Sequence, residues 1–274
     1  MEKENIVLLT GGSAGLGKAT AELLMANGYR VYSASRRLAE SKRDETSGGE
    51  IIPLQMDVTN LQSVESAVAR IKQEQGRIDI LICNAGNGIA GSIEDTSLDE
   101  VRYQFETNFF GTVNVVHAVL PIMREQMRGK IVTTSSVAGF IPIPYQGFYS
   151  ASKAAIKIYS QTLSIEMKQF NVQCCCVLPG DAKTDFTASR KFTQAALSPE
   201  SAYTEKMKKA VDVMAHDEQN GMAPVEISKA ILTQLKKKKM DLVTIPGISY
   251  KLISFIFRLV PNRFLLFVVD KLYS

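Results

Sequence analysis

Short apolar runs alternate along this chain with longer stretches in which apolar residues recur three or four positions apart. A short continuous apolar run predicts a buried strand, and the helical spacing predicts an amphipathic helix. Strands are predicted at residues 6–10, 30–34, 51–55, 78–83, 131–134 and 172–178. Helices are predicted at residues 16–27, 60–75, 98–125 and 149–169.

This alternation predicts the fold class. Continuous apolar strands joined by helices are typical of a parallel sheet that is covered on both faces. Pro224 is expected to begin a further helix. Residues 241–246 are expected to form a seventh strand. We therefore expect an α/β fold, a doubly wound parallel sheet of about seven strands with helices on both faces, formed by residues 1–274 as a single domain.

Composition and charge argue against several classes of partner and site. Apolar residues make up 45% and charged residues 22% of the 274 residues, as in ordinary globular proteins. The net charge of +4 is too small and diffuse to indicate a nucleic-acid partner, so none is expected. The four cysteines lack the spacing of metal ligands or of a disulfide framework, which predicts no metal and a reducing, cytoplasmic compartment.

The first predicted strand ends in a glycine-rich turn, Thr10–Gly17, that opens the first predicted helix. Glycines in such a turn allow tight bending and let a pyrophosphate approach the backbone at the helix N-terminus. Because the turn joins a strand to a helix within a βαβ unit, it predicts a dinucleotide site better than a flexible loop. The residues assigned to that site from this turn are Gly11, Ser13, Gly15, Leu16 and Gly17.

The end of the second predicted strand indicates which dinucleotide binds. An acidic residue at this place would accept hydrogen bonds from the ribose 2′-hydroxyl of NAD. The chain instead has Ser35, Arg36 and Arg37, and a planar guanidinium group is well matched to a 2′-phosphate. The sequence therefore predicts NADP(H) as the cofactor.

Two further turns follow strands that should end at the same edge of the sheet. After the third strand come Asp57 and Val58, where a carboxylate can accept a hydrogen bond from an adenine amino group. The alternative, that Asp57 forms a cap-like turn before the next helix, stays open. After the fourth strand, the small residues Asn84, Ala85 and Gly86 allow backbone to lie against a flat ligand.

The stretch from Ser136 to Lys153 carries the candidate chemistry. Tyr149 and Lys153 are four residues apart in a predicted helix and so share one of its faces. A nearby ammonium group favours a phenolate, so we expect Lys153 to lower the pKa of Tyr149 toward working pH. Ser136 ends the preceding strand and is placed to bond the same substrate oxygen. Taken alone, the pair also fits an ordinary amphipathic helix with a snorkelling lysine.

The combination of these motifs resembles the short-chain dehydrogenase/reductase family over roughly residues 5–185. That family has a TGxxxGxG turn, an NAG motif, an Asn-Ser-Tyr-Lys tetrad with YxxxK, and a PG motif after the sixth strand. The matching residues here are Thr10–Gly17, Asn84–Gly86, Asn108, Ser136, Tyr149, Lys153, Pro179, Gly180 and Thr184. More narrowly, the run from Phe140 to Lys153 is similar to the hydroxysteroid and retinol dehydrogenase-like branch and to ketosphinganine reductases.

The resemblance implies a Rossmann-type oxidoreductase that moves a hydride between a nicotinamide and a carbonyl or alcohol carbon. By this resemblance Tyr149 is the general acid/base, Lys153 lowers its pKa and binds the nicotinamide ribose, and Ser136 orients the substrate oxygen. Asn108 would hold a relay water where its helix is locally broken. Pro179, Gly180 and Thr184 would border the nicotinamide, and a homodimer or homotetramer is implied.

The remaining segments concern the substrate. Residues 186–222 follow the sixth strand and are expected to cover it. In the tail, residues 249–274, two apolar blocks are each too short to span a bilayer. Three interpretations of the tail remain open: packing on the fold or in a dimer, walling a hydrophobic pocket, and peripheral attachment to a membrane.

These features together predict an NADP(H)-dependent enzyme that interconverts a ketone or aldehyde and an alcohol on a hydrophobic substrate. The apolar stretch Phe140–Tyr145 favours a steroid-, retinoid- or long-chain lipid-like compound. Two alternatives are an NAD-linked alcohol dehydrogenase of the same fold and a non-catalytic NADP(H)-binding sensor.

Overall fold

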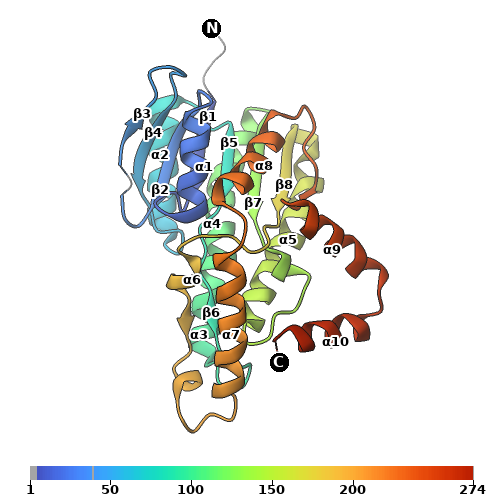
Figure 1. The fold of residues 1–274 in the computed structure, drawn as a ribbon. Coiled ribbons are helices and arrows are strands. Elements are labelled where there is room, and N and C mark those ends of the chain that lie inside the picture. Colours follow the sequence, from blue (N-terminus) through green and yellow to red (C-terminus); the bar gives the residue numbers. More distant parts are fainter. Residues whose placement is uncertain (1–4, 39, 274) are drawn as a thin grey trace.

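An eight-stranded sheet forms the centre of the molecule, which is a computed structural model that describes residues 5–38 and 40–273 (Figure 1). The strand order is β10-β8-β7-β5-β1-β2-β4-β3. The strands are β1 (Ile6–Thr10), β2 (Arg30–Ser35), β3 (Lys42–Arg43), β4 (Glu50–Gln55), β5 (Ile80–Cys83), β7 (Gly129–Thr134), β8 (Val172–Val177) and β10 (Val243–Thr244).

Seven of these strands run parallel, and only the edge strand β3 pairs antiparallel with its neighbour β4. The parallel strands are the ones that the apolar runs predict, so the predicted fold class is confirmed. The strand order reverses at β1, which lies between β2 and β5. In an open sheet of this kind ligands bind beyond the carboxyl ends of the strands at the reversal point.

Helices cover both faces of the sheet (Figure 1). Buried residues of α2, α4 and α5 pack on one face, and those of α1 and α8 pack on the other. The helices are α1 (Gly15–Met25), α2 (Leu61–Gln75), α3 (Leu98–Phe105), α4 (Gly111–Glu125), α5 (Gly147–Glu166), α6 (Phe186–Ser189), α7 (Thr204–Gln219), α8 (Pro224–Lys236), α9 (Ile248–Leu259) and α10 (Asn262–Tyr273).

Strand β8 shows why its sequence has no alternating pattern. Cys174 packs in the core beneath α2, α4 and α5, whereas Cys175 packs in the core beneath α1 and α8. Successive side chains of a strand point to opposite faces, and here both faces are buried, so both positions are apolar.

Three features were not predicted from the sequence. The antiparallel edge strand β3 is one, and the second is a separate ribbon in which β6 (Ile89–Ala90) pairs with β9 (Lys191–Phe192). The third is that the predicted segment 186–222 begins with only one helical turn, α6, before α7. The ribbon matters for function because it ties the segment after β8 to the loop after β5.

The C-terminal tail forms α9 and α10, a hairpin that stands out from the sheet at the end of the colour scale in Figure 1. Within the part of the chain that the structure describes, no helix has the length and apolar character needed to cross a membrane.

Candidate active site

The glycine-rich turn lies at the carboxyl end of β1 with the backbone that only glycine adopts readily. Gly11 and Gly15 have φ angles of +70° and +50°. A Cβ atom on Gly17 would lie 2.0 Å from the carbonyl oxygen of Gly11, so the close approach of helix and turn excludes any side chain. Helix α1 begins after Ala14 without a side-chain cap, which leaves the amides of its first turn for an anionic ligand.

The NAG motif lies beside this turn, across the reversal point of the sheet. The Thr10 hydroxyl accepts hydrogen bonds of 3.0 Å from the backbone N–H groups of both Asn84 and Ala85. A Cβ atom on Gly86 would lie 3.2 Å from Asn108 Oδ1 and 3.4 Å from Lys153 Nζ. The small residue therefore leaves a space into which two members of the predicted tetrad project.

The predicted adenosine end of the site lies at the ends of β2 and β4. Arg36 and Arg37 are exposed directly after β2, and the Ser35 hydroxyl donates to the Arg37 carbonyl. Asp57 accepts hydrogen bonds from the Thr59 N–H (3.0 Å) and hydroxyl (2.8 Å), so it forms the turn before α2, while Asn60 is the N-cap. Ser13 borders a hollow of about 240 Å³ next to the turn.

Four other predicted residues take structural positions around that site. Leu16 packs against the core formed by α1 and α8. Val58 is buried against Gly111, whose Cβ atom would lie 2.6 Å from it. Pro179 accepts a hydrogen bond of 2.9 Å from the Val137 N–H through its carbonyl. The Thr184 side chain lies 3.4 Å from where a Gly15 Cβ atom would be, so the segment after β8 closes onto the glycine turn.

Asn108 lies in a π-helical turn, Glu106–Phe110, that separates α3 from α4. The predicted local break in the 98–125 helix is thus confirmed. Its fully buried side chain accepts from the Asn87 N–H (2.9 Å) and donates to the Asn87 carbonyl (3.0 Å) and the Ser152 hydroxyl (3.1 Å). The backbone carbonyl of Asn108 accepts one hydrogen bond, from the Thr112 hydroxyl (2.9 Å).

The structure brings Ser136, Tyr149 and Lys153 together at the carboxyl end of β7. Tyr149 and Lys153 are buried, and the half-buried Ser136 lies close enough to Tyr149 to lower the pKa of its phenol. Ser136 Oγ also accepts from the Ala138 N–H at 3.1 Å, which fixes the hydroxyl at the start of a short 3₁₀ turn. These contacts give one buried cluster of proton-carrying groups.

The pKa of Tyr149 does not move in the direction that the sequence predicts. Burial raises it to about 12, because the phenolate would lose its hydration, and the Ser136 side chain opposes this only in part. Burial lowers the pKa of Lys153 to about 8. The Lys153 ammonium donates a hydrogen bond to the Thr134 carbonyl at 3.0 Å and lies 5.7 Å from the centre of the Tyr149 ring.

Sequence reasoning missed five residues at or near this site. The Phe186 ring lies 5.6 Å from the Tyr149 ring, and the buried Arg190 forms an ion pair with Glu218 of α7. From α9, the Tyr250 hydroxyl donates to Asp181 (2.6 Å). No local pattern marks these residues, because each meets its partner only through the tertiary fold.

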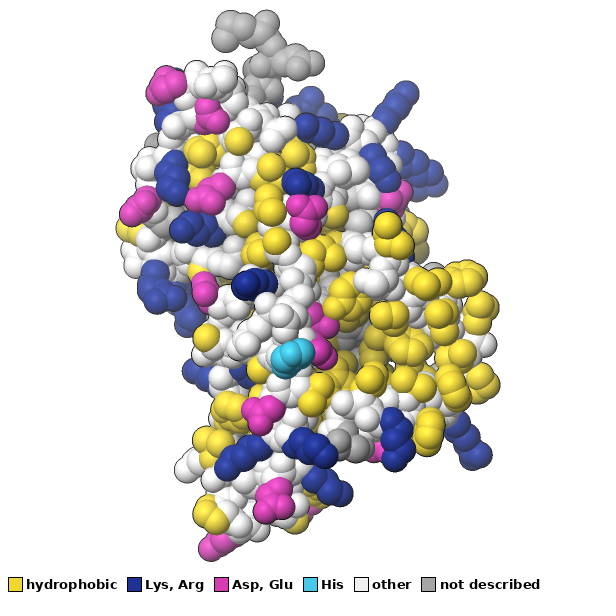
Figure 2. Space-filling model, in the orientation of Figure 1, with side chains coloured by type: hydrophobic (Ala, Val, Ile, Leu, Met, Phe, Trp, Pro, Cys, Tyr) yellow, Lys and Arg dark blue, Asp and Glu magenta, His cyan; other side chains and the backbone are white. Residues whose placement is uncertain are grey.

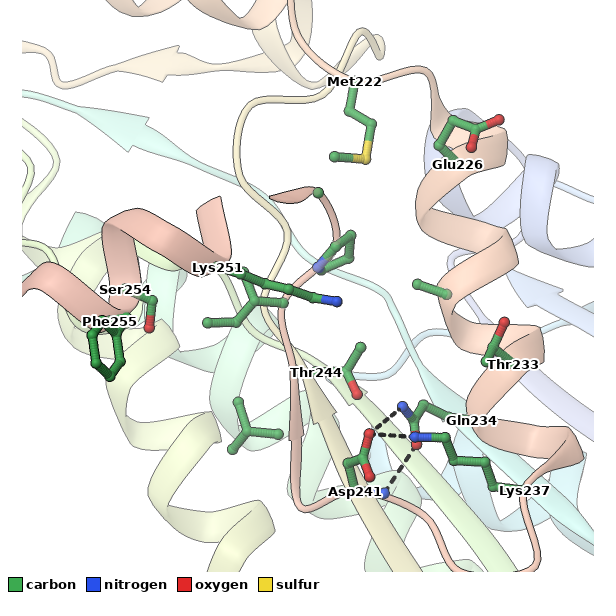
Figure 3. Close-up of a pocket in the computed structure, with 15 residues that line it drawn as sticks. Met222, Glu226, Thr233, Gln234, Lys237, Asp241, Thr244, Lys251, Ser254 and Phe255 are labelled. Carbon is green, nitrogen blue, oxygen red and sulfur yellow. Dashed lines mark hydrogen bonds and ion pairs between the residues drawn. The ribbon is translucent and has the colours of Figure 1, made fainter. Parts of the chain in front are cut away.

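A separate hollow of about 810 Å³ lies between α8, β10 and α9, and none of the predicted site residues lines it (Figure 3). On its wall the Asp241 carboxylate accepts hydrogen bonds from Gln234 and Lys237, so these three polar groups bond one another. We place the chemistry at Tyr149 and not in this hollow, because the reactive groups converge at Tyr149.

The sequence matches the family model described as short chain dehydrogenase over residues 5–195. The chain belongs to this family. A 3-ketodihydrosphingosine reductase of Bacteroides thetaiotaomicron is 43% identical over 233 residues, which is 85% of this chain and 84% of that protein. Human retinol dehydrogenase 8 is 36% identical over 185 residues, 66% of this chain and 60% of that protein.

Among solved structures, a short-chain dehydrogenase from Streptomyces avermitilis superposes with a TM-score of 0.79 at 28% identity, covering 93% of this chain and 92% of the other. The chain is therefore an oxidoreductase of the short-chain dehydrogenase family with the Rossmann fold and the nucleotide-binding motifs of that family. The similarity to ketosphinganine reductases and retinol dehydrogenases indicated by the sequence is confirmed as well.

Proposed function

We propose that this protein is an NADPH-dependent reductase of a long-chain lipid ketone, with a 3-keto sphingoid base as its substrate. The observation that carries this proposal is the buried Tyr149 hydroxyl beside the half-buried Ser136 and the buried Lys153, in a chain 43% identical to a 3-ketodihydrosphingosine reductase. The pair supplies the proton and the orientation that carbonyl reduction requires.

The residues present fit a nicotinamide dinucleotide. Gly11 and Gly15 hold the turn open at the uncapped N-terminus of α1, which suits a pyrophosphate. The exposed Arg36 and Arg37 suit a 2′-phosphate, and the end of β2 offers no carboxylate that would favour NAD. When bound, NADPH supplies the hydride.

Tyr149 suits the role of proton donor in the reducing direction. Its raised pKa of about 12 keeps the phenol protonated at neutral pH, so it can donate to a developing alkoxide. Ser136, which lies beside the Tyr149 phenol, would bond the same substrate oxygen and share its negative charge. Lys153 would contribute positive charge to the site and a hydrogen bond to the nicotinamide ribose.

An apolar substrate fits the surroundings of Tyr149. The Phe186 ring lies against it, and the 140–145 segment follows β7 and the short 3₁₀ turn that begins after Ser136. The 43% identical relative is a 3-ketodihydrosphingosine reductase, and that ketone lies on a long alkyl chain that is apolar except near its polar end. A lipid of this class therefore fits better than a sugar or a small hydroxy acid.

The test is a titration of the purified chain with NADPH and NADH, followed by reduction of 3-ketodihydrosphingosine measured by loss of reduced-nicotinamide absorbance. Losing one charged hydrogen bond costs about 1.5–3 kcal/mol, so Arg36→Ala should weaken NADPH binding roughly 10–100-fold and leave NADH binding unchanged. Arg43→Ala, an exposed arginine on β3, is the matched control. Tyr149→Phe should bind NADPH normally without turnover.

Two outcomes would contradict the proposal. Equal affinity for NADH in the wild type would favour an NAD-linked dehydrogenase. Tight NADPH binding without turnover of any long-chain ketone would favour a nucleotide sensor.

A further inference from the structure

The C-terminal hairpin, residues 248–273, exposes much more apolar surface than the rest of the chain. Nine of the 21 large apolar side chains that the described residues expose lie in this segment. In Figure 2 they gather over the hairpin as a continuous apolar area. The nine residues are Ile248, Leu252, Phe255, Ile256, Leu259, Phe264, Leu266, Phe267 and Leu272.

Their spacing on α9 shows that this exposure is organised. Five of them recur at intervals of four, three, one and three residues, which places them on one face of the helix. They are between 44% and 87% exposed, whereas Ser254 on the inward face is 4% exposed. A helix that is apolar on its outer face as well as its inner one lacks a partner for the outer face.

Both ends of the hairpin are fixed to segments that border the active site. At the start of α9 the Tyr250 ring lies against Gly180, and its hydroxyl donates to Asp181 at 2.6 Å. In α10, Leu265 and Val269 are buried, and this helix contacts α7, the helix that carries Glu218. The outward apolar faces are therefore held in a fixed place relative to Tyr149.

The charges in the segment limit the choice of partner. It carries Lys251, Arg258, Arg263 and Lys271 against one acidic residue, Asp270. Arg263 and Lys271 are exposed on α10, and Lys271 Nζ lies 6.0 Å from the centre of the Phe267 ring. A symmetric contact between two copies would bring this positive charge against itself, whereas an anionic lipid surface complements it.

We propose that α9 and α10 dock on the surface of a lipid bilayer, with their outer apolar faces at the boundary between headgroups and acyl chains. Each helix has 12 residues, about 18 Å, which suits a position in the membrane plane and is too short to cross the roughly 30 Å hydrocarbon core. Docking in this way holds the opening beside Tyr149 at the membrane, where a lipid ketone would enter. This last step rests on the proposed function.

Flotation of the full chain with vesicles, without cofactor or substrate, tests the docking. Wild type should float with vesicles of phosphatidylcholine and phosphatidylglycerol. Phe255→Ser/Phe267→Ser should reduce the bound fraction at least about tenfold, because it removes two aromatic side chains that docking would bury in the lipid. The control, Leu61→Ser/Leu98→Ser, changes two exposed leucines away from the hairpin and should float like wild type.

A second variant keeps the test informative if the double phenylalanine variant fails to fold. Arg263→Glu/Lys271→Glu should lose at least tenfold in binding to vesicles that contain phosphatidylglycerol and little in binding to phosphatidylcholine alone. Absence of flotation by wild type, or equal loss in the leucine control, overturns the proposal. The proposal is also overturned if wild type does not float but forms a dimer in sedimentation, and if Phe255→Ser/Phe267→Ser dissociates that dimer.

The two proposals fail in distinguishable ways. Reduction of a short-chain, water-soluble analogue of the ketone needs no vesicle. Retained turnover without flotation overturns only the membrane docking, and flotation without turnover overturns only the reductase function.

Discussion

The ammonium group of Lys153 donates a hydrogen bond to the Thr134 carbonyl at 3.0 Å and lies 5.7 Å from the centre of the Tyr149 ring. Both side chains are buried on the same face of α5. Helix α5 is thus joined to the end of β7 by a charged donor that has little water around it, and this has measurable consequences.

Folding should become more favourable as Lys153 loses its proton. Its pKa of about 8 in the folded protein lies below the ordinary 10.5, so this stabilisation is complete above about pH 10.5 and is lost as the pH falls through about 8. Between pH 8 and 10 the free energy of unfolding of wild type should rise relative to Lys153→Met by on the order of 2 kcal/mol. Urea unfolding at several pH values measures the difference.

The control for this prediction is Ile158→Met, at an exposed position of α5 that carries no titratable group. Its difference from wild type should stay constant over the same pH range. A constant difference for Lys153→Met as well would show that the Lys153 ammonium is not desolvated.

Gly180 and Tyr250 should be energetically coupled. A Cβ atom on Gly180 would lie 2.2 Å from the Tyr250 ring, so Gly180→Ala should cost about 1–3 kcal/mol by overpacking. In Gly180→Ala/Tyr250→Ala the ring is absent, and the double variant should be more stable than the sum of the single effects by about 1–2 kcal/mol. Urea unfolding of the four proteins gives the coupling energy.

The control is a second double-mutant cycle that pairs Tyr250→Ala with Gly76→Ala. A Cβ atom added at Gly76 would have no other atom within 4 Å. Gly76→Ala and Tyr250→Ala should be additive within a few tenths of a kcal/mol. Additivity at Gly180 too would mean that α9 does not hold the segment after β8.

Asn108 should be required for stability as well as for activity. Asn108→Ala removes three hydrogen bonds and leaves the part-buried Asn87 N–H without its partner, which should lower the free energy of unfolding by about 2–4 kcal/mol. Asn114→Ala, which removes one bond of 2.9 Å to the Val58 carbonyl, should cost about 1 kcal/mol. Thermal or urea unfolding without cofactor measures both effects. Equal stability of the two variants would contradict this role of Asn108.

Sequence patterns predict the central parallel strands because β1, β5 and β8 are buried on both faces and so are mostly apolar, as β8 is at Cys174 and Cys175. The glycine turn is predictable for a similar reason, since the positive φ of Gly11 and Gly15 requires glycine. In both cases the constraint is local, and it shows in the residue type.

Other features depend on contacts between distant segments and leave no local pattern. Tyr250 meets Asp181 across 69 residues, and the β6–β9 ribbon has only two residues in each strand. The pKa of Tyr149 was mispredicted because spacing along a helix gives the direction of a side chain but not its hydration. Burial outweighs the charge of Lys153 when that charge bonds a carbonyl instead of the phenol.

The π-helical turn at Glu106–Phe110 also fixes the length of its segment. Each residue of an α-helix turns the chain by about 100°, so deleting one residue from the π turn would rotate α3 by that angle relative to α4. Gln104, whose buried side chain bonds the Ile89 N–H (2.9 Å) and the Asn87 carbonyl (3.0 Å), would then face away from the loop after β5. Exposed side chains of this segment are free to vary, whereas the number of residues in it is not.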